Sequence, residues 1–244
     1  MEDQFSRTRL LLGKDAMEKL KNARIAVFGI GGVGGYTVEA LARSGVGALD
    51  LIDNDTINLS NLNRQIVATH STIGKYKVDA AAERVLDINP DIQVRTYRTF
   101  YLPDTADQFD FLQYDYIVDA IDTVTAKLLL ITTAKAANVP IICSMGTGNK
   151  LDPTRFEVTD LAKTTMCPLA RIMRKECHKR GIDHVKVLYS KEDALTPLDD
   201  DGNPIPGPEG SSRRSLPGSV AFVPSVAGLI IAGEVIKDLI AVPK

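Results

Sequence analysis

The sequence predicts an α/β protein with a Rossmann-like, doubly wound and mostly parallel sheet, which strands from the C-terminal part of the chain extend. One observation is the alternation of short apolar runs with helical patterns over residues 24–145. Such alternation is typical of βαβ units, which place parallel strands between two layers of helices. The other is the glycine cluster "GIGGVGG" at 29–35, between the first apolar run and the helical pattern that follows it. A glycine-rich turn at this place is typical of nucleotide-binding α/β folds.

The patterns place the elements of this fold in order along the chain. Strands are expected at residues 24–29, 48–53, 92–97, 114–121 and 139–145. Helices are expected at residues 14–21, 33–44, 75–88, 104–112 and 124–137. Gly45 and Gly47 end the second helix, and Pro90 limits the third because the residue before a proline avoids helical geometry. Beyond residue 150 we expect a strand within 155–164, a basic helix at 165–180, a strand at 185–190 and a final helix.

We interpret residues 1–244 as a single domain, with a nucleotide-binding core at 1–150 and a C-terminal elaboration at 151–244. The long loop at 198–218, "LDDDGNPIPGPEGSSRRSLPG", contains four prolines and four glycines and has no apolar stripe. Loops of this length are usually functional or disordered, and the sequence leaves both interpretations open.

Composition and charge are those of an ordinary globular protein, with 44% hydrophobic residues, 25% charged residues and a net charge of −2. The chain as a whole is therefore not a polyanion binder, although a local basic face is allowed. Three cysteines without a C-x-x-C pair argue against a disulfide framework and against a structural zinc site. The chain starts without a signal pattern, and its apolar segment 223–242 carries three charges. We therefore expect a cytoplasmic protein without a membrane anchor.

The glycine cluster predicts a phosphate site. Gly29, Gly31 and Gly34 fit the pattern G-x-G-x-x-G between a strand and a helix, and Gly32 lies in the same turn. Free N–H groups at the start of the helix would hold phosphate. Asp53 ends the next strand, where it would bind ribose hydroxyls. This pattern by itself is compatible with NAD as well as with ATP.

The polar loop after the second strand favours ATP. "DNDTINLSNLNRQ" places Asp55, Asn61 and Arg64 just beyond that strand, and Lys77 follows thirteen residues after Arg64. Neither cation has an acidic partner nearby in that loop, and a triphosphate calls for cationic clamps. Asp119 and Asp122 end the fourth strand at the same edge of the sheet. A carboxylate that faces phosphates suggests Mg²⁺ as a cofactor.

Four motifs together, "GIGGVGG", "DNDTINLSNLNRQ", "GKYKVDAA" and "VDAIDT", resemble the ThiF/MoeB/ubiquitin-activating-enzyme superfamily of adenylating enzymes. The resemblance covers residues 5–148 and implies a catalytic domain that binds ATP and Mg²⁺. By position it implies that Gly31 and Gly34 line the phosphate turn and that Asp53 holds the ribose. It assigns the phosphates to Asn61, Arg64 and Lys77, and the metal to Asp122. Arg7 matches an arginine that reaches into the neighbouring subunit's site, which implies a homodimer.

The C-terminal half resembles the tRNA threonylcarbamoyladenosine dehydratase branch of this superfamily, through the run "DPT…VTDLAKT…PLA" and the absence of paired C-x-x-C motifs. That resemblance implies ATP-dependent cyclisation of threonylcarbamoyladenosine at position 37 of tRNA, through an acyl-adenylate. A first alternative is an enzyme that adenylates a ubiquitin-like sulfur carrier, with a cysteine desulfurase or sulfur-acceptor system as partner. A second, an NAD-dependent oxidoreductase, has only the glycine pattern and Asp53 in its favour.

Two further features admit two interpretations each. The basic residues Arg171, Arg174, Lys175 and Lys179, together with Arg213 and Arg214, form either tRNA contacts or a solvated face. Cys167 directly precedes Pro168 at the start of the basic helix. It is either a half-buried packing residue or a thiol that acts through a thioester or persulfide.

Overall fold

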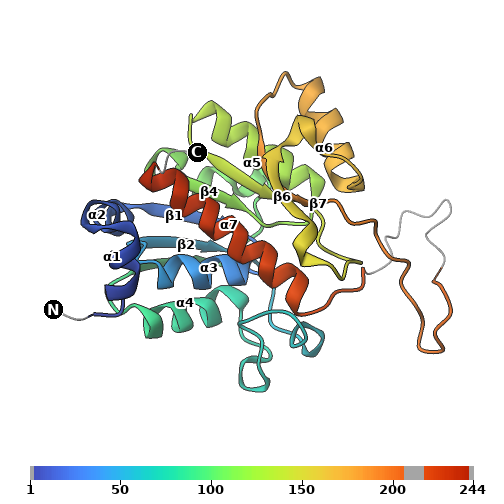
Figure 1. Cartoon of the computed structure of the whole chain (residues 1–244), viewed down its shortest axis with the longest axis horizontal. Helices are drawn as coiled ribbons and strands as arrows, with labels where there is room; N and C mark the ends of the chain where they lie inside the picture. The colour runs from blue at the N-terminus through green and yellow to red at the C-terminus, as the bar shows by residue number, and fades with distance from the viewer. Residues whose placement is uncertain (1–2, 206–216, 242–244) are drawn as a thin grey trace.

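Strand β1 (Arg24–Phe28) is an inner strand of the sheet, and its apolar residues, Ile25 to Phe28, are all buried. The computed structural model describes residues 3–205 and 217–241, and in this part the strands form one seven-stranded sheet in the order β3-β2-β1-β4-β5-β7-β6 (Figure 1). The other strands are β2 (Ala48–Ile52), β3 (Gln93–Tyr97), β4 (Tyr116–Asp119), β5 (Ile141–Ser144), β6 (Phe156–Asp160) and β7 (Lys186–Ser190). All neighbouring strands pair parallel except β6, which pairs antiparallel with β7 at one edge. The expected doubly wound sheet, extended by C-terminal strands, is thereby confirmed.

Helices cover both faces of this sheet. The α-helices are α1 (Ser6–Leu12), α2 (Lys14–Asn22), α3 (Gly34–Arg43), α4 (Lys77–Ile88), α5 (Val124–Ala136), α6 (Pro168–Lys179) and α7 (Phe222–Ile240). One hydrophobic core joins the sheet to α3, α4 and α7, and the other joins it to α5 and α6. Figure 1 shows α3 and α4 below the strands, with α7 crossing in front, and α5 and α6 above the strands. The sheet order reverses between β1 and β4, and this reversal is where such folds bind ligands.

The C-terminal helix α7 packs closely on α3. A Cβ atom on Gly228 would lie 2.3 Å from the carbonyl oxygen of Val33, so only glycine permits this approach. The Thr37 hydroxyl also donates a hydrogen bond to the Gly228 carbonyl, at 3.1 Å. The close contact brings the start of α7 next to the glycine cluster. None of the helices in the described part of the chain combines the length and the apolarity that a membrane crossing requires.

The local structure differs from the expected one at two places. The helix expected at 104–112 is absent, and two 3₁₀ turns, Pro103–Gln108 and Phe111–Gln113, stand in its place. The Asp110 carboxylate accepts a hydrogen bond from the Leu112 N–H at 3.0 Å, which starts a new turn inside the expected helix. Phe109 and Phe111 are buried against other aromatic rings, and this packing outweighs the local helical pattern. Helix α1 was not expected and precedes the first expected helix.

Candidate functional site

A cavity of about 370 Å³ opens at the carboxyl ends of β1, β2 and β4, at the point where the strand order reverses. The loops that follow these three strands all contribute residues to its lining. The expected site residues that line it are Gly29, Gly31, Gly32, Asp53, Asp55, Asn61, Arg64, Lys77 and Asp122. The sequence therefore identified three of the loops that line this cavity, while the role of each residue stays a prediction.

The glycine turn forms the floor of the cavity. Gly29 has a φ of +90°, which favours glycine, and a Cβ there would lie 2.7 Å from the Ala120 carbonyl oxygen. Gly34, the first residue of α3, does not line the cavity. A Cβ on Gly34 would lie 1.8 Å from the Gly29 carbonyl oxygen, so this glycine lets the helix approach the turn. The start of α3 therefore lies at the cavity, which Gly31, Gly32 and Val33 line, and a helix N-terminus at this place is suited to phosphate.

At the wall formed by the loop after β2, Lys77 is buried and Asp53 is largely buried. Asp53 accepts hydrogen bonds from the N–H groups of Ile30 (2.7 Å) and Asp55 (2.8 Å). Burial raises the pKa of Asp53 above its usual value, and the nearby Lys77 ammonium group opposes that rise. The Lys77 Nζ lies 2.6 Å from Asp55 Oδ2 and 4.0 Å from Asp53 Oδ2. The expectation that Lys77 lacks a nearby acidic partner is therefore wrong, because folding brings the carboxylates of Asp53 and Asp55 to it from the other end of the loop.

Among the described residues, Arg64 is hydrogen-bonded to neutral groups of its own loop. Its Nη1 donates to the Ser60 carbonyl and to Asn63 Oδ1, both at 2.9 Å. Asn61 is buried, and its side-chain oxygen accepts the Asn58 N–H at 3.0 Å, which stabilises the turn that carries Arg64. The oxygen Oε1 of Gln65 is buried in the cavity wall without a hydrogen-bond partner among the described residues. A buried acceptor of this kind needs a donor, which a bound nucleotide or an ordered water would supply.

Asp122 is exposed at the side of the cavity formed by the loop after β4. Its Oδ1 accepts a 3.2 Å hydrogen bond from the Thr123 hydroxyl, and its other oxygen points to no described partner. Within residues 3–205 and 217–241, no group of three or more His, Cys, Asp or Glu side chains could hold a metal ion. Mg²⁺ commonly takes one or two carboxylates together with substrate phosphates and water. The residues present therefore fit a cation shared with bound phosphates. By contrast, Asp119 is fully buried and does not line the cavity.

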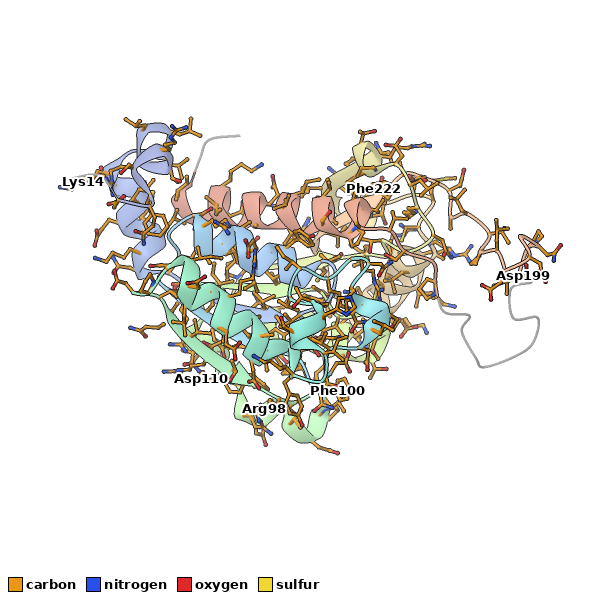
Figure 2. All side chains as sticks on the ribbon, turned by 90° about the horizontal axis from the view of Figure 1, so that it is seen from below. Lys14, Arg98, Phe100, Asp110, Asp199 and Phe222 are labelled. Atoms are coloured by element: carbon orange, nitrogen blue, oxygen red, sulfur yellow. The ribbon has the colours of Figure 1, made fainter. Side chains whose placement is uncertain are left out.

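Several lining residues escaped the sequence analysis. They come from the loop after β3, from the loop after β5, from the segment before α7 and from the first turn of α7: Thr99, Phe100, Tyr101, Leu102, Thr147, Ser219 and Pro224. Phe100, labelled in Figure 2, is 53% exposed, and Leu102 is 40% exposed. The sequence offers one local signal for this part of the site, which is the aromatic residue Phe100 in the loop after an expected strand. The Asn63 side chain donates to the Ser219 carbonyl at 2.9 Å, which ties the segment before α7 to the Arg64 loop.

Arg7 does not line the cavity of its own chain. It is exposed on α1, whose neighbour Phe5 packs near Gly45 between α3 and β2. This place is at the amino ends of the strands, whereas the cavity is at their carboxyl ends. A role for Arg7 in catalysis therefore requires a second subunit.

The basic helix contains residues of two kinds. Arg174 is partly buried, and its Nη1 donates to the carbonyl and to the hydroxyl of Thr164, at 2.6 and 2.5 Å. Lys179 forms an ion pair with Glu176 at 2.7 Å. Arg171 and Lys175 are exposed and form no ion pair within the described residues, so they are better placed for phosphate contacts than Arg174. Arg213 and Arg214 lie outside the described residues.

Cys167 is buried rather than half-buried, with an exposed fraction of 4%. It stands immediately before α6, in extended geometry, and Pro168 is the first helical residue. No cysteine lines the cavity in the described part of the chain. Its burial and its place outside the cavity lining favour the interpretation of Cys167 as a packing residue.

The chain is similar to known proteins along nearly its whole length. The model of the ThiF family matches residues 5–244. The tRNA threonylcarbamoyladenosine dehydratase of Bacillus subtilis is 43% identical, over 98% of this chain and 96% of its own. The enzyme of the same name from Escherichia coli is 35% identical, over 98% and 94%. Crystal structures of that E. coli enzyme, TcdA, in complex with ATP and with AMP superpose with TM-scores of 0.86 and 0.87 at 34% identity, covering 98% of this chain and 94% of that one.

Proposed function

The chain belongs to the ThiF family, and we propose from this membership and from its cavity that it dehydrates threonylcarbamoyladenosine in tRNA with ATP. The observation that carries this conclusion is the likeness to tRNA threonylcarbamoyladenosine dehydratases along 98% of the chain. The likeness includes the C-terminal half, where the superfamily's branches differ. The resemblance stated from the motifs is thereby confirmed.

A carboxylate is a poor electrophile, and the reaction first converts it into a good one. The carboxylate of the threonylcarbamoyl group attacks the α-phosphorus of ATP, pyrophosphate leaves, and an acyl-adenylate forms. An atom of the neighbouring urea group then attacks the acyl carbon, loses its proton, and expels AMP as the ring closes. The oxygen removed from the carboxyl group leaves in AMP, so the net change in the nucleoside is the loss of water. Ring closure is intramolecular, and holding the urea group and the acyl carbon in the correct orientation supplies much of the reduction in its activation barrier.

The groups around the cavity suit the charges of the first step. Arg64, Lys77 and the N-terminus of α3 stabilise the phosphates, and each such contact contributes about 2–4 kcal/mol in a site without water. For Lys77 this means that phosphate oxygens compete with Asp55, whose side chain is 55% exposed and able to turn away. Asp53 and Asn61 orient the ribose and the turn, while Phe100 and Leu102 provide an apolar surface for the base.

Asp122 would hold Mg²⁺ together with phosphate oxygens, and the ion would neutralise charge on them. The Asp122→Asn variant should lose Mg²⁺-dependent turnover far more than nucleotide affinity. Wild-type turnover of this variant at every Mg²⁺ concentration would assign the metal to another group.

We expect a homodimer in which each site receives Arg7 from the other subunit. Support comes from the place of Arg7, exposed and away from the cavity of its own chain. Mixing Arg7→Ala with Lys77→Ala subunits should restore about half of the sites in each mixed dimer. Absence of any rescue would refute the exchange. A sulfur-transfer partner stays a prediction, as does a cytoplasmic location, where the tRNA substrate is found.

The decisive experiment is mass spectrometry of tRNA nucleosides after incubation with ATP. Loss of water from threonylcarbamoyladenosine, dependent on ATP and accompanied by pyrophosphate, is the expected result. Pyrophosphate exchange stimulated by a sulfur-carrier protein but not by tRNA would instead favour the carrier-activating alternative. The absence of any cysteine from the described cavity lining counts against that alternative, because sulfur transfer requires a working thiol.

A further inference from the structure

A fully buried ion pair lies behind the cavity wall. Asp119, the last residue of β4, and Lys127, on α5, approach to 2.8 Å between Oδ2 and Nζ, and neither side chain is exposed. Removing two charges from water is costly, and a well-packed apolar pair of similar volume is often as stable or more stable. Stability alone therefore gives little reason for this pair.

Both partners also bind the backbone of one residue, Ile121. The Asp119 Oδ1 accepts a hydrogen bond from the Ile121 N–H at 3.2 Å, and the Lys127 Nζ donates to the Ile121 carbonyl at 2.9 Å. Residues 120–123 belong to no helix or strand, so these bonds replace those that secondary structure would provide. The pair thus binds both the N–H and the C=O group of Ile121.

This residue lies between two parts of the cavity wall. Ala120 precedes it, and the Ala120 carbonyl packs against the glycine turn so closely that a Cβ on Gly29 would lie 2.7 Å away. Asp122 follows it and lines the cavity. A shift of the Ile121 backbone would therefore move the Asp122 carboxylate relative to the phosphate turn.

We infer that Asp119 and Lys127 are positioning residues, which hold the segment 120–123 so that the Asp122 carboxylate stays directed at the phosphates. Neither contacts the cavity, so their effect passes entirely through the backbone of Ile121. The inference rests on the proposed function in that Asp122 acts on a cation bound to ATP.

The test uses the double variant Asp119→Leu/Lys127→Met of the full chain, which replaces both charges by apolar groups of similar size. Single variants are unsuitable because they leave one buried charge without its partner. We expect a free energy of unfolding no lower than that of the wild type and exchange of the 121 amide at least tenfold faster. In calorimetry the double variant should bind ATP as the wild type does without Mg²⁺, and the small gain in affinity that Mg²⁺ gives the wild type should be lost. Turnover should fall about 100-fold, the effect of a misplacement of about 1 Å.

The control is Arg84→Met, which breaks the Glu39–Arg84 ion pair between α4 and α3 outside the cavity. It should leave amide exchange at 120–123, the Mg²⁺ effect and turnover unchanged. If the apolar double variant does not fold, Asp119→Asn/Lys127→Gln tests the same loss with neutral polar groups and should show a smaller change in each measurement.

Three outcomes would overturn the inference. Amide exchange at 120–123 could stay slow, the Mg²⁺ effect on ATP affinity could persist, or turnover could stay at the wild-type level in a folded double variant. Failure of the wild-type protein to dehydrate tRNA would refute the proposed function instead. Amide exchange and ATP calorimetry need no tRNA, so they decide the role of the pair in either case.

Discussion

At Gly34, the first residue of α3, a Cβ would lie 1.8 Å from the carbonyl oxygen of Gly29 and 2.9 Å from its carbonyl carbon. Real Cβ contacts stay above about 3.0 Å, and both groups here are backbone. The Gly34→Ala variant must therefore separate α3 from the glycine turn by more than an ångström. Overpacking costs about 1–3 kcal/mol, and a displacement of about 1 Å in a site costs about 100-fold in activity. We expect Gly34→Ala to lose about 3 kcal/mol of unfolding free energy and about 100-fold in turnover, with weaker ATP binding because the glycine turn is displaced.

Gly31→Ala is the matched variant. A Cβ there meets no atom within 4 Å, yet Gly31 lines the cavity, so its methyl group would extend into open space where phosphates are expected. Its unfolding free energy should stay within about 0.5 kcal/mol of the wild-type value. Its affinity for ATP should fall at least tenfold, because a backbone approach to phosphate requires glycine.

Urea unfolding followed by circular dichroism measures stability, and calorimetric titration measures ATP affinity. Gly233→Ala, within α7 and with no atom near the added Cβ, is the control. It should keep ATP binding and gain up to about 1 kcal/mol, because alanine favours a helix over glycine. A stable Gly34→Ala protein with normal ATP affinity would refute the close-approach argument. Normal ATP affinity of Gly31→Ala would remove this turn from the phosphate site.

Three further predictions follow from the contacts described. Lys77→Ala should lower turnover about 100-fold or more. Lys75→Ala, which removes an exposed ion pair two residues earlier, should leave turnover unchanged. Pyrophosphate release measures both variants, and equal rates would exclude a contact between Lys77 and the phosphates. Cys167→Ala should keep most activity in the tRNA assay and lose about 1 kcal/mol of stability, since the thiol is buried and ring closure needs no covalent enzyme intermediate; a folded but inactive variant would instead support a thioester or persulfide. Replacing Arg171 and Lys175 with alanine should weaken tRNA binding and lower its salt dependence by up to about 0.9 per lost contact. An unchanged salt dependence would identify the exposed side of α6 as a solvated face.

Local features of the sequence predicted the architecture well. Apolar strands separated by helical patterns are visible residue by residue, and the resulting parallel sheet is the one observed. The site was predicted in part for the same reason. The loops that follow neighbouring parallel strands meet at one edge of the sheet. Residues after β1, β2 and β4 therefore had to converge, as Gly31, Arg64 and Asp122 do. The four motifs identified the family because each combines a turn with a fixed set of polar groups.

Contacts between segments far apart in the sequence became visible only in the folded chain. The order of the strands, the position of the glycine turn and the family could be predicted from the sequence, because these depend on neighbouring residues. It did not show that Lys77 meets Asp55, that Arg174 is bound to Thr164, or that Ser219 reaches the cavity. It also placed a helix where burial of Phe109 and Phe111 produced two short turns. In each case the free energy comes from packing and hydrogen bonds made after the chain folds back on itself, and no local pattern encodes those partners.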